Sequence, residues 1–267
     1  MLAQKLAHSL PTIKNPRYDP GNITELTNWY KYQTLITADE DESGGALSPV
    51  HSTAAGTMQL EDRVNQWDDV ISNNLATQTV SDDKPTWETF PTAPATQYPN
   101  LLFTGVQWLD MTSNIAISAN QDFSIMAHVV FTDLTARAMY GSNANNFFRI
   151  NDASGFRCKI GGAGNSNFTE VSDEITSQKD FYVTIQRSNG VTGRLACYVH
   201  CEDIYEDKTW GSTALTDPDA FTINNIGASS DDTNEFQGVI KNLLFYKDKV
   251  LTSAERKQNY TYLNALL

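Results

Sequence analysis

The sequence predicts an all-β protein, a two-sheet antiparallel sandwich with an N-terminal extended or helical arm and one C-terminal helix. Three observations support this prediction. Apolar residues alternate with polar ones in many short runs, turn-forming clusters separate those runs, and a helical pattern closes the chain. Many short strands with turn punctuation are typical of sandwiches, whereas strands alternating with helices would indicate a parallel sheet.

The N-terminus predicts an arm and linker over residues 1–30, ahead of a main domain over residues 31–267. Leu2, Leu6 and Leu10 recur at helical spacing before a proline ends the pattern. Three leucines are too few to form a core of their own, so we expect them to dock into another chain. The alternative is a frayed terminus without a role.

The segment after the arm predicts a helical turn and then a long acidic loop. Asn22 with Glu25 three residues later is typical of a helix start. Residues 33–66 lack clear periodicity and contain four successive acidic residues at 39–42. These acidic residues show no regular calcium-ligand spacing, so we expect a solvated loop.

Two-residue periodicity predicts the strands of the main domain. The runs with this pattern lie at 123–131, 156–160, 181–186, 195–201 and 239–246. The last run is apolar on both faces, which indicates a strand covered on both sides. Turn clusters rich in Gly, Asn, Asp and Ser separate the runs.

The C-terminus predicts the one helix of the domain. Thr252 and Glu255 have the spacing of a capping box, and Tyr260, Leu263 and Leu267 form a helical stripe. We expect this helix to pack on the sandwich.

Charge and cysteine content limit the function classes. Lys and Arg number 19 against 32 Asp and Glu, a net charge of -13, which disfavours nucleic-acid binding. No apolar run is long enough to cross a bilayer, so we expect no membrane insertion. The N-terminus lacks the continuous apolar stretch of a signal peptide, so we expect no Sec-type secretion. Three cysteines, an odd number, predict reduced thiols rather than a disulfide framework.

Several short motifs follow one another in a fixed order between residues 60 and 267. They are Val64-Asn65-Gln66-Trp67-Asp68-Asp69, Asn73-Asn74-Leu75-Ala76-Thr77-Gln78, Pro85-Thr86-Trp87, Asn100-Leu101-Leu102-Phe103-Thr104-Gly105-Val106-Gln107-Trp108-Leu109, Phe236-Gln237-Gly238-Val239-Ile240 and Leu251-Thr252-Ser253-Ala254-Glu255-Arg256. Together they resemble the concanavalin A-like, or laminin G-like, jelly-roll family in the form common in bacteriophage virion proteins. The chain departs from that pattern at Thr104 and Trp108, where the family often has Asp.

The resemblance implies a virion structural protein, either a capsid decoration or a tail or fibre component. Such a protein would be made in the cytoplasm of the bacterial host and displayed on the particle surface. Its partners would be other virion proteins, bound through the N-terminal arm, and further copies of itself. We expect it to be non-enzymatic, with no cofactor other than a candidate calcium ion.

A search for catalytic patterns supports the expectation of no enzymatic activity. Glycoside hydrolysis needs two carboxylates close together, and no E-x-D-x-x-E strand is present. The nearest pattern is the acidic run at 202–207, which we expect to be a solvated strand end. The four histidines have no zinc spacing, and no G-x-S-x-G motif occurs. A polysaccharide-degrading enzyme with dispersed carboxylates stays as the less favoured alternative.

Sugar binding is the stronger alternative, as an adhesion module for host-surface glycans. Aromatic rings that stack on sugars and loop amides that bind hydroxyls are needed for it. The candidate ligand-binding residues are Trp108, Tyr140, Asn143 and Trp210. The candidate calcium ligands are Asp231, Asp232 and Asn234.

Overall fold

The computed structural model describes residues 19–31, 36–41, 46–51, 60–88, 100–161, 164–170, 174–189, 193–201, 205–215, 219–230 and 234–265. For residues 46–51 and residue 205 only the backbone is described.

Strands dominate the described residues, which confirms the all-β prediction. They are β1 (Leu26–Tyr30), β2 (Ile36–Glu40), β3 (Ala46–His51), β4 (Arg63–Asp68), β5 (Leu75–Thr77), β6 (Thr86–Glu88), β7 (Asn100–Thr104), β8 (Leu109–Ile117), β9 (Phe123–Phe131), β10 (Arg137–Asn143), β11 (Asn146–Asp152), β12 (Gly155–Lys159), β13 (Ser166–Thr169), β14 (Asp180–Ser188), β15 (Arg194–Cys201), β16 (Tyr205–Ala214), β17 (Phe221–Ile226) and β18 (Gln237–Lys247). The helical elements are two 3-10 turns, η1 (Pro20–Asn22) and η2 (Ser81–Asp83), and one α-helix, α1 (Ser253–Asn264). In this part of the chain, no helix has the length and apolar character needed to cross a membrane.

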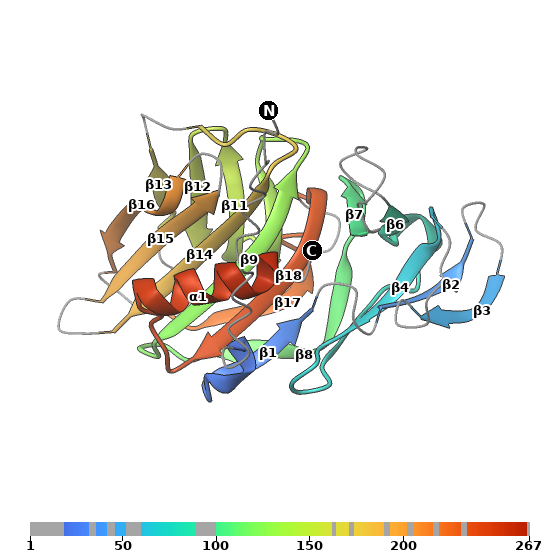
Figure 1. Ribbon diagram of the computed structural model, residues 1–267, viewed down its shortest axis with the longest axis horizontal. Helices are drawn as coiled ribbons and strands as arrows, with labels where there is room; N and C mark the ends of the chain where they lie inside the picture. The colour runs from blue at the N-terminus through green and yellow to red at the C-terminus, as the bar shows by residue number, and fades with distance from the viewer. Residues whose placement is uncertain are drawn as a thin grey trace, which may run out of the picture.

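The strands form one 18-stranded antiparallel sheet, which folds over into two facing layers (Figure 1). One layer has the order β16–β15–β14–β9–β18, with β1 and β7 paired along the other side of β18. The second layer has the order β13–β12–β11–β10–β17–β8–β5–β4–β2–β3. Strand β6 pairs with both β4 and β7 and so connects the two layers.

The main core lies between the layers and is rich in aromatic rings. Phe148 stacks on Phe156 at 5.6 Å between ring centroids, and Tyr140 meets Phe245 of the opposite layer edge to face. A second apolar cluster lies on the outer face of the first layer, under α1. Because the helix covers that face, β9 and the middle of β18 are buried on both sides, as the sequence predicts for the run at 239–246.

The predicted helical turn after Asn22 is wrong, because Leu26–Tyr30 forms β1 and pairs with β18. Side chains of successive strand residues point to opposite faces. Trp29 therefore packs under α1, where its ring meets Tyr262, while Tyr30 packs in the main core against Trp67. Burying one aromatic ring in each cluster favours a strand over a helical turn.

The long loop predicted for residues 33–66 is also wrong in part, since β2, β3 and the start of β4 lie there. Two of its acidic residues have a structural role. Asp39 and Glu40 accept hydrogen bonds from the Nζ of Lys84, at 2.9 and 2.5 Å. Lys84 is only 2% exposed, so these carboxylates neutralise a buried cation rather than facing solvent.

Helix α1 begins with the predicted capping box between Thr252 and Glu255. Its Arg256 binds Asp207 of β16 through two hydrogen bonds, of 2.7 and 2.9 Å. Ser253 and Tyr260 donate to the same carboxylate. Asp207 is therefore a buried anchor for the helix, and its predicted place in a solvated strand end is wrong. Residues 202–204 of that acidic run lie outside the described residues.

The three cysteines are free and buried, as predicted. Burial raises the pKa of the Cys158 and Cys197 thiols, so these side chains stay protonated and act as small apolar groups.

Candidate functional site

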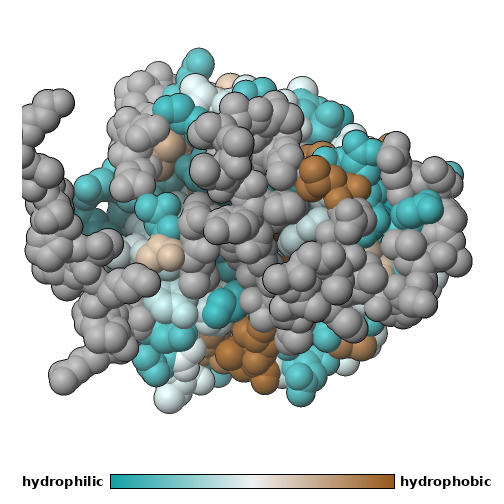
Figure 2. All heavy atoms as spheres, turned by 45° about the vertical axis from the view of Figure 1, so that its right-hand side comes forward, coloured by the Kyte–Doolittle hydropathy of each residue, from teal (hydrophilic) through white to brown (hydrophobic). Residues whose placement is uncertain are grey.

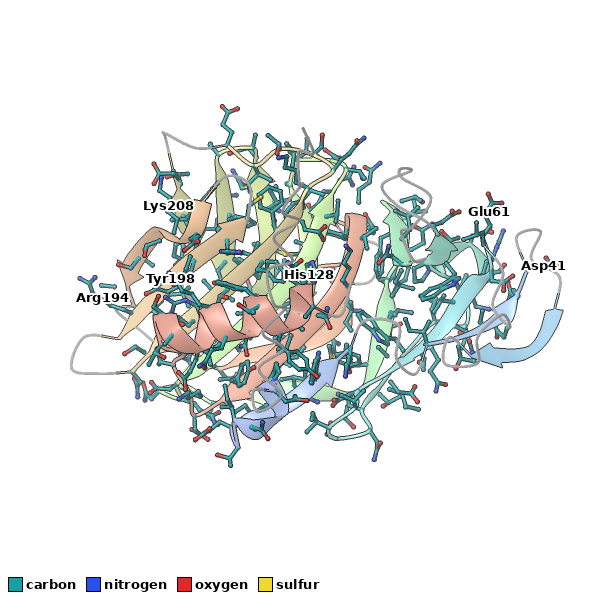
Figure 3. The ribbon with its side chains drawn as sticks, viewed as in Figure 1. Asp41, Glu61, His128, Arg194, Tyr198 and Lys208 are labelled. Carbon is teal, nitrogen blue, oxygen red and sulfur yellow. The ribbon has the colours of Figure 1, made fainter. Side chains whose placement is uncertain are left out.

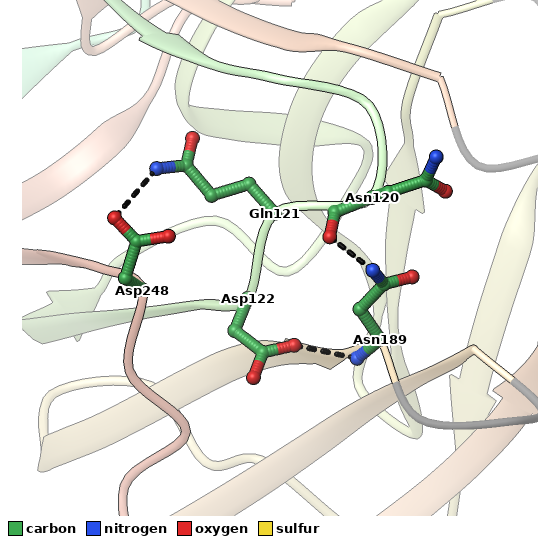
Figure 4. Close-up of a pocket in the computed structure, with 5 residues that line it drawn as sticks. All are labelled: Asn120, Gln121, Asp122, Asn189 and Asp248. Atoms are coloured by element: carbon green, nitrogen blue, oxygen red, sulfur yellow. Dashed lines mark hydrogen bonds between the residues drawn. The ribbon is translucent and has the colours of Figure 1, made fainter.

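The candidate site is a polar pocket of about 350 Å³ among loops that join the strands of the first layer (Figure 4). It is lined by Asn120, Gln121, Asp122, Asn189 and Asp248. The first three residues directly precede β9, Asn189 follows β14, and Asp248 follows β18. Three chain segments far apart in sequence thus supply its walls.

Hydrogen bonds among the lining residues fix the shape of the pocket. Gln121 donates to Asp248 at 2.9 Å, and the backbone of Asn189 donates to Asp122 at 2.6 Å. The Asn189 amide also donates to the carbonyl of Asn120. Asn120 and Asp248 have φ values of 64° and 59°, a left-handed conformation that Asn and Asp tolerate better than most residues.

Arg187 holds the loops beneath this pocket. Its guanidinium is fully buried and donates to three backbone carbonyls, those of Gln121, Asp219 and Ser118, at 2.8, 2.8 and 2.5 Å. It also lies over the ring of Phe123, 5.1 Å from the centroid. Ser118 and Gln121 lie in the connection before β9, and Asp219 lies in the connection before β17, so this one side chain ties two loops together, the first of which lines the pocket.

The chemistry of the pocket suits neutral polar groups. Its amides can donate and accept hydrogen bonds, and its two carboxylates accept them. Sugar hydroxyls present the same combination of donors and acceptors. None of the lining residues is aromatic, so a ligand here would be held by hydrogen bonds rather than by ring stacking.

The aromatic residues predicted to bind a ligand lie elsewhere. Tyr140 and Trp210 are 0% and 1% exposed, and both are part of the main core. Their ring faces pack against other side chains, so they are not available for stacking in this structure. Trp108 is 8% exposed, and its indole nitrogen donates to Asp110 at 3.3 Å. Asn143 is exposed but accepts a hydrogen bond from the backbone of Asn145, which is ordinary turn chemistry.

Of the predicted calcium ligands, only Asn234 is described. Its side-chain oxygen faces the guanidinium of Arg149 at 3.4 Å, and its amide donates to Ser229. Asp231 and Asp232 lie outside the described residues. Among the residues that are described, no group of three or more His, Cys, Asp or Glu side chains could hold a metal ion. Calcium at residues 231–234 stays a prediction.

The predicted assembly arm also lies outside the described residues, so the structure places none of Leu2, Leu6 and Leu10.

A buried polar cluster around His128 lies on the outer face of the first layer. Figure 3 shows His128 near one end of α1. Its Nε2 is 2.8 Å from Asp180, which also receives a hydrogen bond from Lys241 at 2.7 Å. Its Nδ1 is 3.3 Å from the amide of Asn242. Burial lowers the pKa of His128 despite Asp180, so the ring is neutral with both nitrogens partnered. We assign this cluster a structural role.

The described surface exposes few large apolar side chains. They are Leu60, Ile71, Val80 and Val106, each about half exposed. Figure 2 shows separate small apolar patches among hydrophilic atoms on the face turned to the viewer. Scattered exposure of this kind is normal for a protein surface and marks no docking site.

The sequence interpretation missed every residue of the pocket. Its members come from three loops, and only the register of β9 with β14 and β18 brings them together. One sequence feature could have pointed to these residues. Asn120-Gln121-Asp122 directly precedes a strong strand pattern, as turn residues often do.

No family model matches the chain, and no curated protein matches it in sequence. A GH54 α-L-arabinofuranosidase soaked with a cyclic sulfate inhibitor matches with a TM-score of 0.59 and 12% identity, over 89% of this chain and 61% of that chain. An arabinofuranosidase complexed with arabinofuranosyl-α-1,2-xylobiose matches with a TM-score of 0.57 at the same identity and coverage. Domain 4 of AbnA, a GH43 extracellular arabinanase from Geobacillus stearothermophilus, in complex with arabinotriose, has a TM-score of 0.49 and 13% identity, over 89% of this chain and 97% of that chain.

The TM-scores of the two arabinofuranosidases show a shared fold, and the chain spans about three-fifths of those two chains. The finding contradicts the expectation that the chain is not an enzyme. Solved structures with this fold include glycoside hydrolases, so the missing sequence motif does not exclude catalysis. The error has a physical reason: loops from distant parts of a sandwich can bring carboxylates together without any local spacing pattern.

Proposed function

We propose that this chain is a carbohydrate-binding β-sandwich domain that holds a saccharide in the loop pocket of Asn120, Gln121, Asp122, Asn189 and Asp248. The observation that carries the proposal is the pocket itself, whose amides and carboxylates match sugar hydroxyls and whose segment at 118–122 is held by Arg187. A rigid polar site loses little entropy when it binds a flexible ligand. The fold shared with arabinofuranosidases adds support.

Binding to an array of neutral and charged oligosaccharides, with and without calcium, tests this proposal. We expect at least one saccharide to bind. We expect Asn189→Ala and Asp122→Asn to weaken that binding at least tenfold, because each loses hydrogen bonds to hydroxyls. Asn114→Ala, at an exposed amide on β8 outside the pocket, is the matched control and should leave the affinity unchanged. Absence of binding, or an equal effect of the control, would contradict the proposal.

A second candidate function is glycoside hydrolysis at the same pocket. The specific observation is that the pocket contains two carboxylates, Asp122 and Asp248, the residue type that acts as acid and base or nucleophile in this reaction. Release of reducing sugar from arabinan, xylan and related polymers measures the activity. If the pocket is catalytic, Asp122→Asn and Asp248→Asn each lower the rate at least a hundredfold while melting temperatures change little. A rate unaffected by both substitutions would contradict this role.

For the biological setting, we propose a bacteriophage virion component that displays several copies of the domain and is attached through residues 1–21. The support is the order of sequence motifs between residues 60 and 267 and the spacing of Leu2, Leu6 and Leu10. Deletion of residues 1–21 should leave a folded domain that no longer joins particles. Normal incorporation of the truncated chain would contradict the proposed attachment.

A further inference from the structure

The outer face of the second layer carries a row of cations on β11 and β12. Phe148 and Ile150 point into the core, so Arg149 between them points outward. Arg157 lies between the core residues Phe156 and Cys158 and points outward in the same way.

The strand register brings these cations together. Arg149 and Arg157 are directly opposite each other, and Lys159 is opposite Phe147 in the adjacent row. Opposite residues on antiparallel strands have Cβ atoms about 5 Å apart, and like charges there are destabilising. The sheet therefore holds three positive charges close together, in a chain whose net charge is -13.

No carboxylate of the described residues forms an ion pair with these three side chains. Their partners are the amide oxygens of Asn residues: Asn234 at 3.4 Å from Arg149, Asn167 at 2.7 Å from Arg157 and Asn145 at 2.7 Å from Lys159. The Nε of Arg149 is buried and has no hydrogen-bond partner among the described residues.

Electrostatics agrees with an unbalanced positive charge. Burial and then the charge of Arg157 lower the pKa of Arg149, so both effects disfavour its charged form. The pKa of Asp152 is lowered mainly by its hydrogen bonds with Ser154 and least by the charge of Arg157. An external anion would relieve the repulsion and supply the missing acceptor.

The surroundings suit a saccharide more than a bare ion. The guanidinium of Arg149 lies 5.0 Å from the ring centroid of Phe147, which fixes its plane. Exposed amides of Asn145 and Asn167 flank the cations and can bind hydroxyls. Gly141 of β10 is opposite Phe147 on its other side. A Cβ added at Gly141 would lie 2.7 Å from the carbonyl oxygen of Ser229. The chain at Ser229 thus borders the site on one side.

We propose that the outer face of β11 and β12 is a binding site for an acidic saccharide, with Arg149 and Arg157 holding its carboxylate or sulfate group and Lys159 adding charge. A guanidinium binds either group through two parallel hydrogen bonds. The site shares no residue with the loop pocket, so it goes beyond the proposed function and each can fail without the other.

Titration of the full chain with three oligosaccharides tests this site: oligogalacturonate for carboxylate, a heparin-derived oligosaccharide for sulfate, and an uncharged dextran oligomer. We expect one or both acidic probes to bind, with affinity that falls as salt increases. Arg149→Gln and Arg157→Gln should each raise the Kd at least tenfold, and Lys159→Gln should raise it a few-fold. Arg157 and Lys159 are on the surface, so these variants keep the test valid if Arg149→Gln fails to fold.

Arg194→Gln is the matched control, because Arg194 is an exposed arginine on β15 that bonds Ser212 and no carboxylate of the described residues. It removes the same charge and should leave the Kd of the acidic probe unchanged. The proposal is overturned if neither acidic probe binds, if the control weakens binding as much as Arg157→Gln, or if duplex DNA of equal charge binds as tightly as the saccharide.

Discussion

The outer faces of the two layers use arginine in opposite ways. On the first layer, under α1, Arg256 is 4% exposed and forms a two-bond ion pair with Asp207, and its guanidinium lies 3.6 Å from the ring centroid of Tyr198. On the second layer, Arg149 and Arg157 face each other with only amide partners among the described residues. Arg256 therefore uses its hydrogen-bond donors inside the fold. Arg149 and Arg157 keep donors that a ligand could use.

This difference separates groups that stabilise the fold from groups that are free to bind. Arg187 belongs with Arg256, because three carbonyls accept its hydrogen bonds. A protein gains stability from paired buried charges only when every partner is present. Unpaired like charges cost stability, so their presence in an acidic chain is better explained by a ligand. The following predictions test that separation, from the largest effect to the smallest.

The first prediction concerns the anchor of α1. Asp207→Ala leaves the buried guanidinium of Arg256 without its anion, and we expect the free energy of unfolding to fall by about 3–5 kcal/mol. Urea denaturation measures it. Glu206→Gln, at the neighbouring position where the side chain is 73% exposed, is the control and should change stability by less than about 0.5 kcal/mol. A loss below about 1 kcal/mol for Asp207→Ala would contradict the anchoring role.

The second prediction concerns the clamp beneath the loop pocket. Arg187→Met leaves the carbonyls of Ser118, Gln121 and Asp219 without their common donor, so we expect a loss of about 2–4 kcal/mol in unfolding free energy. Amide hydrogen exchange in residues 118–122 should become faster, because these loops lose their common partner. Arg194→Gln should change neither quantity. Unchanged exchange in Arg187→Met would show that other contacts order the pocket.

The third prediction is an acid sensitivity to which Asp207 and Asp180 on the face covered by α1 contribute. Burial would raise the pKa of Asp207, but hydrogen bonds from Arg256, Ser253 and Tyr260 outweigh it and the pKa is lowered. Asp180 is also lowered, because His128 and Lys241 outweigh its burial. Since both pKa values lie below those of the unfolded chain, their stabilisation is present at neutral pH and is lost as pH falls below about 4.

Melting temperatures measured from pH 7 to pH 3 check this prediction. Asp207→Asn should flatten the acid limb of the curve relative to the native chain, because one of the titrating groups is gone. Arg157→Gln should keep the native shape. Identical curves for Asp207→Asn and the native chain would contradict the assignment.

The fourth prediction is the smallest change in stability, and it is a gain rather than a loss. Arg149→Gln relieves the repulsion between opposite arginines, so we expect stability to stay the same or to rise by up to about 0.5 kcal/mol. Chemical denaturation at low salt gives the measurement. A loss above about 1 kcal/mol would assign Arg149 to the fold rather than to a ligand.

Strand periodicity and helix capping were sufficient to predict the sandwich and α1. Alternation at 156–160 and 181–186 and the capping box at Thr252 depend on neighbours within a few residues, and sequence contains that information. The strand at Leu26–Tyr30 was missed because its partner, β18, lies some two hundred residues later in the chain. Tertiary packing outweighed the local helix-start signal there.

The candidate sites could not be predicted for the same reason. Arg157 and Lys159 stand visibly on the polar face of a predicted strand, but only the register of β11 with β12 places Arg149 opposite Arg157. In the same way, Asp122 and Asp248 meet because β9 pairs with β18. Tyr140 and Trp210 have the right residue type for sugar stacking, yet composition cannot tell which side of a sheet an aromatic ring faces.

A crystal structure of the chain with a bound oligosaccharide would show whether the loop pocket binds a saccharide. Crystals soaked with the best-bound oligosaccharide should show sugar hydroxyls within hydrogen-bond distance of the Asn189 amide and the Asp248 carboxylate. An empty loop pocket in crystals that hold the same sugar elsewhere on the domain would contradict the account.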